Sequence, residues 1–372
     1  MQTVRMRAMR LLLFLLFFSS PAEAQWWKVQ TSGIDTNLRG VSAAYETTMD
    51  RPVVWASGSN GVILKSLDEG KTWRRLHVAD GDKLDFRGIV AFDATTAYVM
   101  SSGDGEKSRI YKTADGGETW KLQYTEKRKE FFLDSIACLS DTHCFAVGDP
   151  MDGKILLLKT TDGQHWNPLP NDERPAALPA EGTFAASNSG LALFDDGQIY
   201  FITGGPAAAR LFHSLDGGHT WTVIETPIVH GNASSGIFSV ASRDGKSVIV
   251  VGGDYQDVKR ASSVAAYSLD GGKTWHLSAQ QPGGFRSAVA FHDGLTFFTV
   301  GPTGEEISDD DGAHWKHTDS LNLNALAILD IFNGWAVGPN GTVARFVNHK
   351  SYEIHNRAPP REQRPTTSSI AE

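Results

Sequence analysis

A unit of about eight residues occurs six times along the chain. It first appears as SLDEGKTW (66–73), with Ser or Thr at its start, Asp at the third position, Gly at the fifth and Trp at its end. The other copies are TADGGETW (113–120), TTDGQHW (160–166, one residue shorter), SLDGGHTW (214–221), SLDGGKTW (268–275) and SDDDGAHW (308–315). Their tryptophans are 47, 46, 55, 54 and 40 residues apart. This period matches that of a four-stranded propeller blade and predicts a repeat architecture.

The residues around each copy follow one order. Two β-rich runs meet at a Gly-rich turn before the unit, as in VVWASGSNGVILKS (53–66). A variable loop and another apolar run follow it, as in FRGIVAFD (86–93). This order predicts an antiparallel meander in which the repeated unit joins the third strand to the fourth.

The residue types of the unit suit a tight turn. A carboxylate can accept hydrogen bonds from nearby backbone N–H groups, and Gly tolerates positive φ. The Trp offers a large apolar surface for packing between blades. We therefore interpret the repeated aspartates as structural; they are Asp68, Asp115, Asp162, Asp216, Asp270 and Asp310.

A seventh repeat is divided between the two ends of the chain. The segment ILDIFNGWAVGPNGTVARF (328–346) matches the first two-thirds of a repeat but lacks the final unit. The segment QWWKVQTSG (25–33) resembles the missing last strand. Pairing the N-terminal strand with the last blade would close the ring and leave no open sheet edge. We predict an all-β, seven-bladed β-propeller over residues 25–347.

The N-terminal 24 residues have the pattern of a secretory signal peptide. Three arginines precede the apolar run 11–18, and Ala22-Glu23-Ala24 forms an A-x-A cleavage site. The run is too short to span a membrane as a helix, although an uncleaved anchor is the alternative. We expect cleavage after Ala24, a secreted or periplasmic protein, and no transmembrane segment after cleavage. The polar, Pro-rich tail 348–372 is expected to be disordered.

The net charge indicates which partners would not bind by charge alone, and the two cysteines bear on the redox state of the compartment. The formal net charge is −8 at pH 7, which gives no general attraction to nucleic acid. Cys138 and Cys144 flank the sequence LSDTH in an expected hairpin. In an oxidising compartment such a pair is a disulfide candidate, and two buried free thiols are the alternative.

The repeated unit resembles the Asp box, or bacterial neuraminidase repeat, of sialidases, sortilin-type receptors and some glucanases. The runs WASGSNGVILKSLDEGKTW (55–73) and GWAVGPNGTVARF (334–346) more closely resemble the photosystem II stability and assembly factor family. That resemblance covers about residues 26–347. It implies a seven-bladed Asp-box propeller that acts as a non-enzymatic chaperone for an assembling membrane complex. It is specific for the fold and weak for activity, because propellers host unrelated functions.

The meander also predicts where a ligand would bind. If the Asp boxes join third to fourth strands, the loops from second to third strands and the loops between blades share the opposite face. In sialidases, too, the Asp-box turns lie away from the active site. Candidate binding residues at the starts of the innermost strands are Arg39, Arg87, Glu130, Asp134, Glu181, His230, Asn232, Arg286 and Asn324. The second-to-third loops add Asp149, Asp152, Asp254, Tyr255 and Lys259.

Two interpretations of the arginines remain open. Arg39, Arg87 and Arg286 hold equivalent positions in three blades and could converge on a carboxylate or phosphate, since a guanidinium binds either through two hydrogen bonds. Alternatively, they seal the channel by bonding backbone carbonyls or Asp134. A glycoside hydrolase would need two carboxylates at a defined separation, which the sequence does not give.

These patterns favour an exported, monomeric, non-enzymatic scaffold that binds a protein partner or an anionic or carbohydrate ligand. The alternative is a sialidase- or glucanase-like hydrolase or a lectin. No H-E-x-x-H or C-x-x-C motif, phosphate loop or dinucleotide-binding motif is present, so no cofactor and no metal are predicted.

Overall fold

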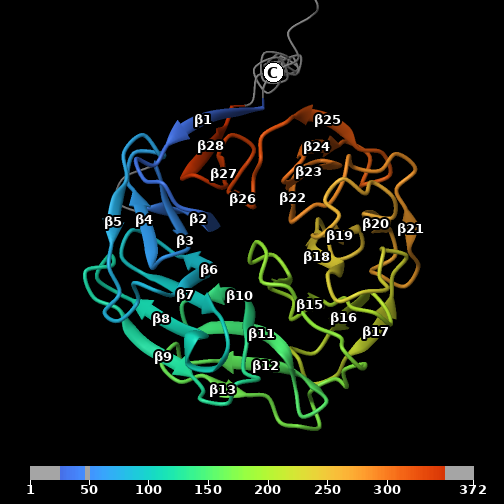
Figure 1. Cartoon of the computed structure of the whole chain (residues 1–372), viewed down its shortest axis with the longest axis horizontal. Coiled ribbons are helices and arrows are strands. Elements are labelled where there is room, and N and C mark those ends of the chain that lie inside the picture. The colour runs from blue at the N-terminus through green and yellow to red at the C-terminus, as the bar shows by residue number, and fades with distance from the viewer. Residues whose placement is uncertain (1–25, 47–50, 348–372) are drawn as a thin grey trace, which may run out of the picture.

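Seven four-stranded sheets form a ring around a central channel (Figure 1). The computed structural model describes residues 26–46 and 51–347. The predicted signal peptide (1–24) and C-terminal tail (348–372) lie outside the described residues. Every sheet is an antiparallel meander with its first strand innermost, so the predicted seven-bladed propeller is confirmed. The described residues contain one short 3₁₀ helix, η1 (Gly105–Lys107), and no α-helix.

Six blades are continuous in sequence, each running from the channel outward. The first three consist of β2 (Leu38–Glu46), β3 (Arg51–Gly58), β4 (Val62–Ser66) and β5 (Arg74–Leu76); β6 (Asp85–Ala91), β7 (Ala97–Ser102), β8 (Arg109–Thr113) and β9 (Lys121–Thr125); and β10 (Leu133–Ser140), β11 (His143–Met151), β12 (Lys154–Thr160) and β13 (Asn167–Pro168). The next three consist of β14 (Leu191–Leu193), β15 (Ile199–Ile202), β16 (Arg210–Ser214) and β17 (Thr222–Glu225); β18 (Ser235–Ser242), β19 (Val248–Asp254), β20 (Ala265–Ser268) and β21 (His276–Leu277); and β22 (Ala288–Asp293), β23 (Thr296–Gly301), β24 (Gly304–Ser308) and β25 (Lys316–Asp319).

The seventh blade closes the ring as predicted. It contains β26 (Ala325–Ile328), β27 (Gly334–Val337) and β28 (Thr342–Phe346), and its outer strand is the N-terminal β1 (Trp27–Thr31). The β1–β28 register places Trp27 opposite Phe346. The buried Trp27 ring contacts Phe346 and also Phe298 of the sixth blade, with centroids 5.5 and 6.1 Å away. The N-terminal strand β1 and the rest of the seventh blade therefore stabilise each other.

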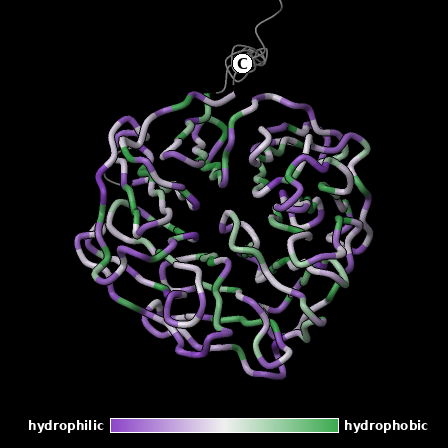
Figure 2. Tube along the Cα trace, viewed as in Figure 1, coloured by the Kyte–Doolittle hydropathy of each residue, from purple (hydrophilic) through white to green (hydrophobic). Residues whose placement is uncertain are grey.

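The hydrophobic core is distributed around the ring. Among the described residues, seven clusters of buried apolar side chains each lie between two neighbouring blades. Consecutive residues of a middle strand point to opposite faces: on β7, Tyr98 contributes to one cluster and Val99 to the next. Because both faces of a blade are buried, the middle strands are continuous apolar runs. Figure 2 shows these hydrophobic segments throughout the ring.

The Asp boxes form tight turns between third and fourth strands. In the first box, the backbone N–H of Gly70 donates to Ser66 Oγ (2.7 Å), and the N–H of Thr72 donates to Asp68 Oδ1 (2.8 Å). Gly70 has a φ of +84°, which favours glycine. Hydrogen bonds led by that from Thr119 lower the pKa of the equivalent Asp115 to about 2. The carboxylates are thus occupied by their own turns.

The two cysteines are bonded in the structure. Cys138 of β10 and Cys144 of β11 lie directly opposite each other, with Cα atoms 4.0 Å apart, and form a disulfide. The bond joins the innermost strand of the third blade to its neighbour.

Candidate binding cavity at the channel mouth

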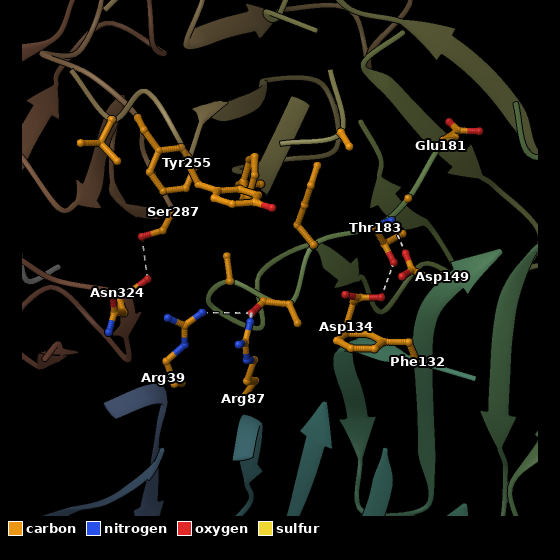
Figure 3. A pocket seen from close by; sticks show the side chains of 18 of the residues that line it. Arg39, Arg87, Phe132, Asp134, Asp149, Glu181, Thr183, Tyr255, Ser287 and Asn324 are labelled. Carbon is orange, nitrogen blue, oxygen red and sulfur yellow. Dashed lines mark hydrogen bonds between the residues drawn. The ribbon is translucent and has the colours of Figure 1, made fainter. Parts of the chain in front are cut away.

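One segment of the fourth blade enters the channel. It lies between β13 and β14, within the longest interval between box tryptophans, and we call residues 180–189 the plug. The carbonyl oxygen of Ala185 accepts hydrogen bonds from Arg39 (3.2 Å) and Arg87 (2.7 Å) of the first two blades. Figure 3 shows both guanidinium groups directed at this one oxygen.

The plug is also fixed to other blades. The Asn188 side chain accepts a hydrogen bond from the N–H of Ile136 (2.8 Å) and donates to its carbonyl (3.0 Å). Ser187 Oγ donates to the carbonyl of Ser287 (2.7 Å) in the sixth blade. Contacts to several blades hold the plug across the channel.

Glycines allow the plug to approach its own blade. The backbone of Gly204 bridges to Gly182 of the plug and to Gly236 at the start of β18. A Cβ atom on Gly204 would lie 2.6 Å from the Cα of Gly236 and 2.6 Å from the carbonyl oxygen of Ser235. Only glycine permits this spacing, because both close atoms belong to the backbone.

The prediction that Glu181 lies at the start of an innermost strand is wrong. That strand, β14, begins at Leu191, and Glu181 belongs to the plug. The small and polar residues between them lack the alternating apolar pattern of a strand. Glu181 forms an ion pair with Arg210 and accepts a hydrogen bond from Thr203 (2.6 Å), so its charge is compensated.

A cavity of about 720 Å³ opens beside the plug at the channel mouth. Its walls come from the starts of innermost strands and from loops between second and third strands, as at Arg39 and Tyr255. In an antiparallel meander these positions lie at the opposite end of the blade from the Asp-box turns. The cavity therefore occupies the face that the sequence predicted for a ligand.

One wall carries two carboxyl groups, Asp134 of β10 and Asp149 of β11. Both are bonded to Thr183 of the plug: Thr183 Oγ1 donates to Asp134 Oδ2 (2.5 Å), and its N–H donates to Asp149 Oδ1 (3.1 Å). Figure 3 shows the three side chains together with Phe132 on one side of the cavity. Within the described residues, neither aspartate forms an ion pair with a Lys, Arg or His.

Burial determines the protonation of these two groups. Asp134 is only 2% exposed, and its burial together with the neighbouring Asp149 raises its pKa well above the usual value. Burial raises the pKa of Asp149 to about 6. At neutral pH the pair therefore holds one ionised carboxylate and one group that resists ionisation.

The opposite wall is aromatic. Phe184 of the plug stacks on Phe238 of β18, with ring centroids 3.9 Å apart. Phe285 and Tyr255 contact Phe238 edge-on, at 4.6 and 6.1 Å. Tyr255 is 49% exposed, and it faces the cavity across from Asp149 in Figure 3.

The arginine wall is largely occupied by the chain itself. Arg87 pairs with Asp85 (2.7 Å) in addition to bonding Ala185, and Arg39 bonds the same carbonyl. Burial and the adjacent Arg87 lower the pKa of Arg39 to about 10, which leaves it protonated at neutral pH. This arrangement corresponds to the interpretation in which the arginines seal the channel through backbone carbonyls.

The third arginine does not join them. Arg286 is 0% exposed and forms an ion pair with Glu306, with a further hydrogen bond to Thr303 (2.7 Å). Of the two interpretations, convergence of three arginines on one ligand therefore does not apply to Arg286. Glu306 belongs to the third strand of the same blade and neutralises the guanidinium below the surface.

The remaining candidates divide between the cavity and its surroundings. Asn324 lines the cavity, although its side-chain amide donates to Asn37 and to the carbonyl of Leu38. Glu130, His230 and Asn232 are exposed and are not among the cavity-lining residues. They lie on loops outside the cavity, although Asn232 donates a hydrogen bond to another candidate, Asp254 (2.9 Å).

Sequence reasoning missed the plug and most of the aromatic wall. Thr183, Phe184, Phe238 and Phe285 were not among the candidates, whereas Asp149 and Tyr255 were. The long interval between Trp166 and Trp221 is the sequence signal for the plug residues Thr183 and Phe184.

No group of three or more His, Cys, Asp or Glu side chains in the described part of the chain could hold a metal ion. No helix in those residues is long and apolar enough to cross a membrane.

Comparison with known proteins agrees with this architecture. Residues 266–277 match the family model of the BNR/Asp-box repeat. The chain is an Asp-box β-propeller. No curated protein matches the propeller in sequence. The match agrees with the Asp-box repeat that the sequence predicts, and solved structures of YCF48 share the propeller fold.

The similar structures share the fold at low sequence identity. YCF48 bound to D1 peptide has a TM-score of 0.62 and 14% identity, covering 87% of the propeller's chain and 97% of its own. YCF48 from Cyanidioschyzon merolae has a TM-score of 0.62 and 15% identity, covering 87% and 99%. The GH74 xyloglucanase from Xanthomonas campestris has a TM-score of 0.59 and 15% identity, covering 86% of this chain and 53% of its own. At such identities the similarity shows the fold alone.

Proposed function

We propose that this propeller is an exported, monomeric, non-enzymatic scaffold that binds a peptide segment of a protein partner at the channel mouth. The observation that carries the proposal is the cavity of about 720 Å³ with carboxyl, arginine and aromatic walls. That volume is within the usual range for ligand sites, roughly 300–1,000 Å³. Export rests on the signal-peptide pattern of residues 1–24, and the Cys138–Cys144 bond suits an oxidising compartment.

Two observations favour a peptide as the ligand. A structure with the same fold, YCF48, is described as bound to D1 peptide. The blade sequences resemble the photosystem II assembly factor family, whose characterised members are non-enzymatic chaperones. Neither observation identifies the partner of this chain.

The hydrolase alternative fits the cavity less well. The xyloglucanase shares the fold, but glycoside hydrolysis needs two carboxyl groups that flank the scissile bond. Asp134 and Asp149 lie on the same wall, both bonded to Thr183, and Asp134 is buried. Glu181 is paired with Arg210. The carboxyl groups are thus arranged for binding rather than for attack from two sides.

The proposal is tested by affinity capture from an envelope extract of the source organism, using residues 25–372 as bait. The informative variant is Tyr255→Ala, since Tyr255 is half exposed and its ring packs only at the edge of the aromatic wall. The matched control is Leu269→Ala, an equally exposed apolar residue in an Asp box on the other face. Both variants are first checked for the wild-type unfolding midpoint.

We expect a discrete protein that is captured by the wild type and by Leu269→Ala and is strongly depleted with Tyr255→Ala. Equal capture by all three baits would contradict a site at the channel mouth. Hydrolysis of a xyloglucan, other glucan or sialoside by the wild type would contradict the non-enzymatic assignment.

A further inference from the structure

Some of the charged side chains around the cavity form ion pairs with a neighbour, and others do not. Glu181 is paired with Arg210, and Arg87 is paired with Asp85. Arg39, the second arginine of the cavity wall, donates to the carbonyl of Ala185. Cationic and anionic side chains are therefore engaged on the arginine and plug sides of the cavity.

The carboxyl wall lacks a direct ion pair. Asp134 and Asp149 receive hydrogen bonds from Thr183, and no cation among the described residues lies within ion-pair distance of either. Arg87 favours the ionised form of Asp134 only from a longer range. Burying a carboxylate without a cation is unfavourable, and a cationic ligand would remove that penalty. A neutral sugar hydroxyl would not, and an anionic ligand would increase it. The wall is thus complementary to a positive charge.

The aromatic wall provides the second requirement of such a ligand. Phe184, Phe238 and Phe285 pack on one another, which fixes Tyr255 at the edge of a rigid apolar surface. Lysine and arginine side chains pair an aliphatic stem with a charged end, and they bind favourably along aromatic faces. Figure 3 places Tyr255 on the opposite side of the cavity from Asp149. A long cationic side chain in the cavity would thus lie between an aromatic wall and a carboxyl wall.

We propose that the cavity recognises a cationic side chain of the bound peptide, a lysine ammonium or an arginine guanidinium. Its charged end pairs with Asp149 above Asp134, and its stem packs against Tyr255. This inference rests on the proposed peptide-binding function and names the chemistry that the site selects. Asp149 is the principal specificity residue, because it is more exposed than the buried Asp134.

The inference is tested with three small probes that differ only in their side chain: the Nα-acetyl N-methylamides of lysine, norleucine and glutamate. Binding is followed by NMR through the backbone amides of Thr183, which donates to Asp149, and of Tyr255. The variants are Asp149→Asn, which keeps an acceptor for the Thr183 N–H, and Tyr255→Ala. Leu269→Ala serves as the matched control.

We expect the lysine probe to bind the wild type at least about tenfold more tightly than the norleucine and glutamate probes. Asp149→Asn should remove about that tenfold preference, and Tyr255→Ala should weaken the lysine and norleucine probes together. Leu269→Ala should leave all affinities unchanged. Equal binding of lysine and norleucine, tighter binding of glutamate, or no binding of the lysine probe up to its solubility limit would each overturn the inference.

Failure of this inference can be distinguished from failure of the proposed function. If the lysine preference is absent while capture of a protein partner still depends on Tyr255, the scaffold function stands and the cationic specificity is wrong. If capture does not depend on Tyr255 either, the site itself is wrong.

Discussion

At the scale of single residues, Glu305 couples stability to pH. The side chain is buried beside the closure of the ring, and its Oε1 accepts a hydrogen bond from Thr318 (2.6 Å). Burial raises its pKa to about 8 from an ordinary value of 4.5. Folding therefore favours the protonated acid. The contribution of the protonated acid to the free energy of unfolding is complete below pH 4.5 and is lost as the pH rises to about 8.

We predict that Glu305→Gln removes this dependence, because the amide stays neutral. Relative to the wild type, its free energy of unfolding should increase across that interval by about 2–4 kcal/mol. Urea denaturation of both proteins at about pH 5 and about pH 9 measures the difference. Parallel stability profiles would show that the carboxyl group ionises in the folded protein without cost.

Arg286 presents the opposite case, a buried charge that is compensated. Its guanidinium is fully buried against Glu306, so Arg286→Ala would leave a carboxylate without its partner. We predict a loss of about 3–5 kcal/mol in the free energy of unfolding, measured by chemical denaturation. The double variant Arg286→Met, Glu306→Leu should recover most of that loss. A destabilisation below about 1 kcal/mol for Arg286→Ala would contradict a buried, interdependent pair.

At the scale of elements, the plug depends on close backbone contact. We predict that Gly204→Ala displaces it, since the new Cβ would lie 2.7 Å from Cε2 of Phe184 in the plug and 2.6 Å from the Cα of Gly236 in β18. The expected cost is about 1–3 kcal/mol. Hydrogen exchange should accelerate in residues 180–189 and stay unchanged in the strands far from the plug. Gly283→Ala is the control, because the nearest atom to its Cβ would be 3.4 Å away, an ordinary contact. Unchanged exchange in the plug of Gly204→Ala would contradict this role.

The blades could be predicted from the sequence, and the plug could not. Blade strands carry local signals: the Asp boxes mark the third-to-fourth turns of six blades, and apolar runs such as 62–64 mark buried strands. The plug has no such period, and its contacts are long-range: 146 residues separate Arg39 from Ala185. Its conformation is set by a channel that exists only after the ring has formed.

The candidate site could likewise be predicted only in part from the sequence. Strand register placed Arg39, Arg87, Asp134, Asp149 and Tyr255 near the channel mouth, where they line the cavity. Strand register could not show that Arg39 lines the cavity while Arg286 does not. Arg286 is held elsewhere by its ion pair with Glu306, a residue of the third strand. Phe184 and Phe238 meet only through the plug.

At the scale of the whole molecule, the closed ring accounts for a fixed cavity. Seven clusters between blades and the β1–β28 pairing hold the blades in place, and the cavity takes residues from most of them. Its walls therefore keep their mutual positions without support from a ligand. Such preorganisation lowers the entropic cost of binding.

The central claim is that the channel mouth opposite the Asp boxes is the binding face. The most direct measurement replaces Tyr255, and separately Leu269, with a photo-crosslinking phenylalanine and irradiates each purified protein in envelope extract. We expect a discrete covalent adduct to a protein from position 255 and none from position 269. Adducts only from position 269, or the same adducts from both positions, would contradict it.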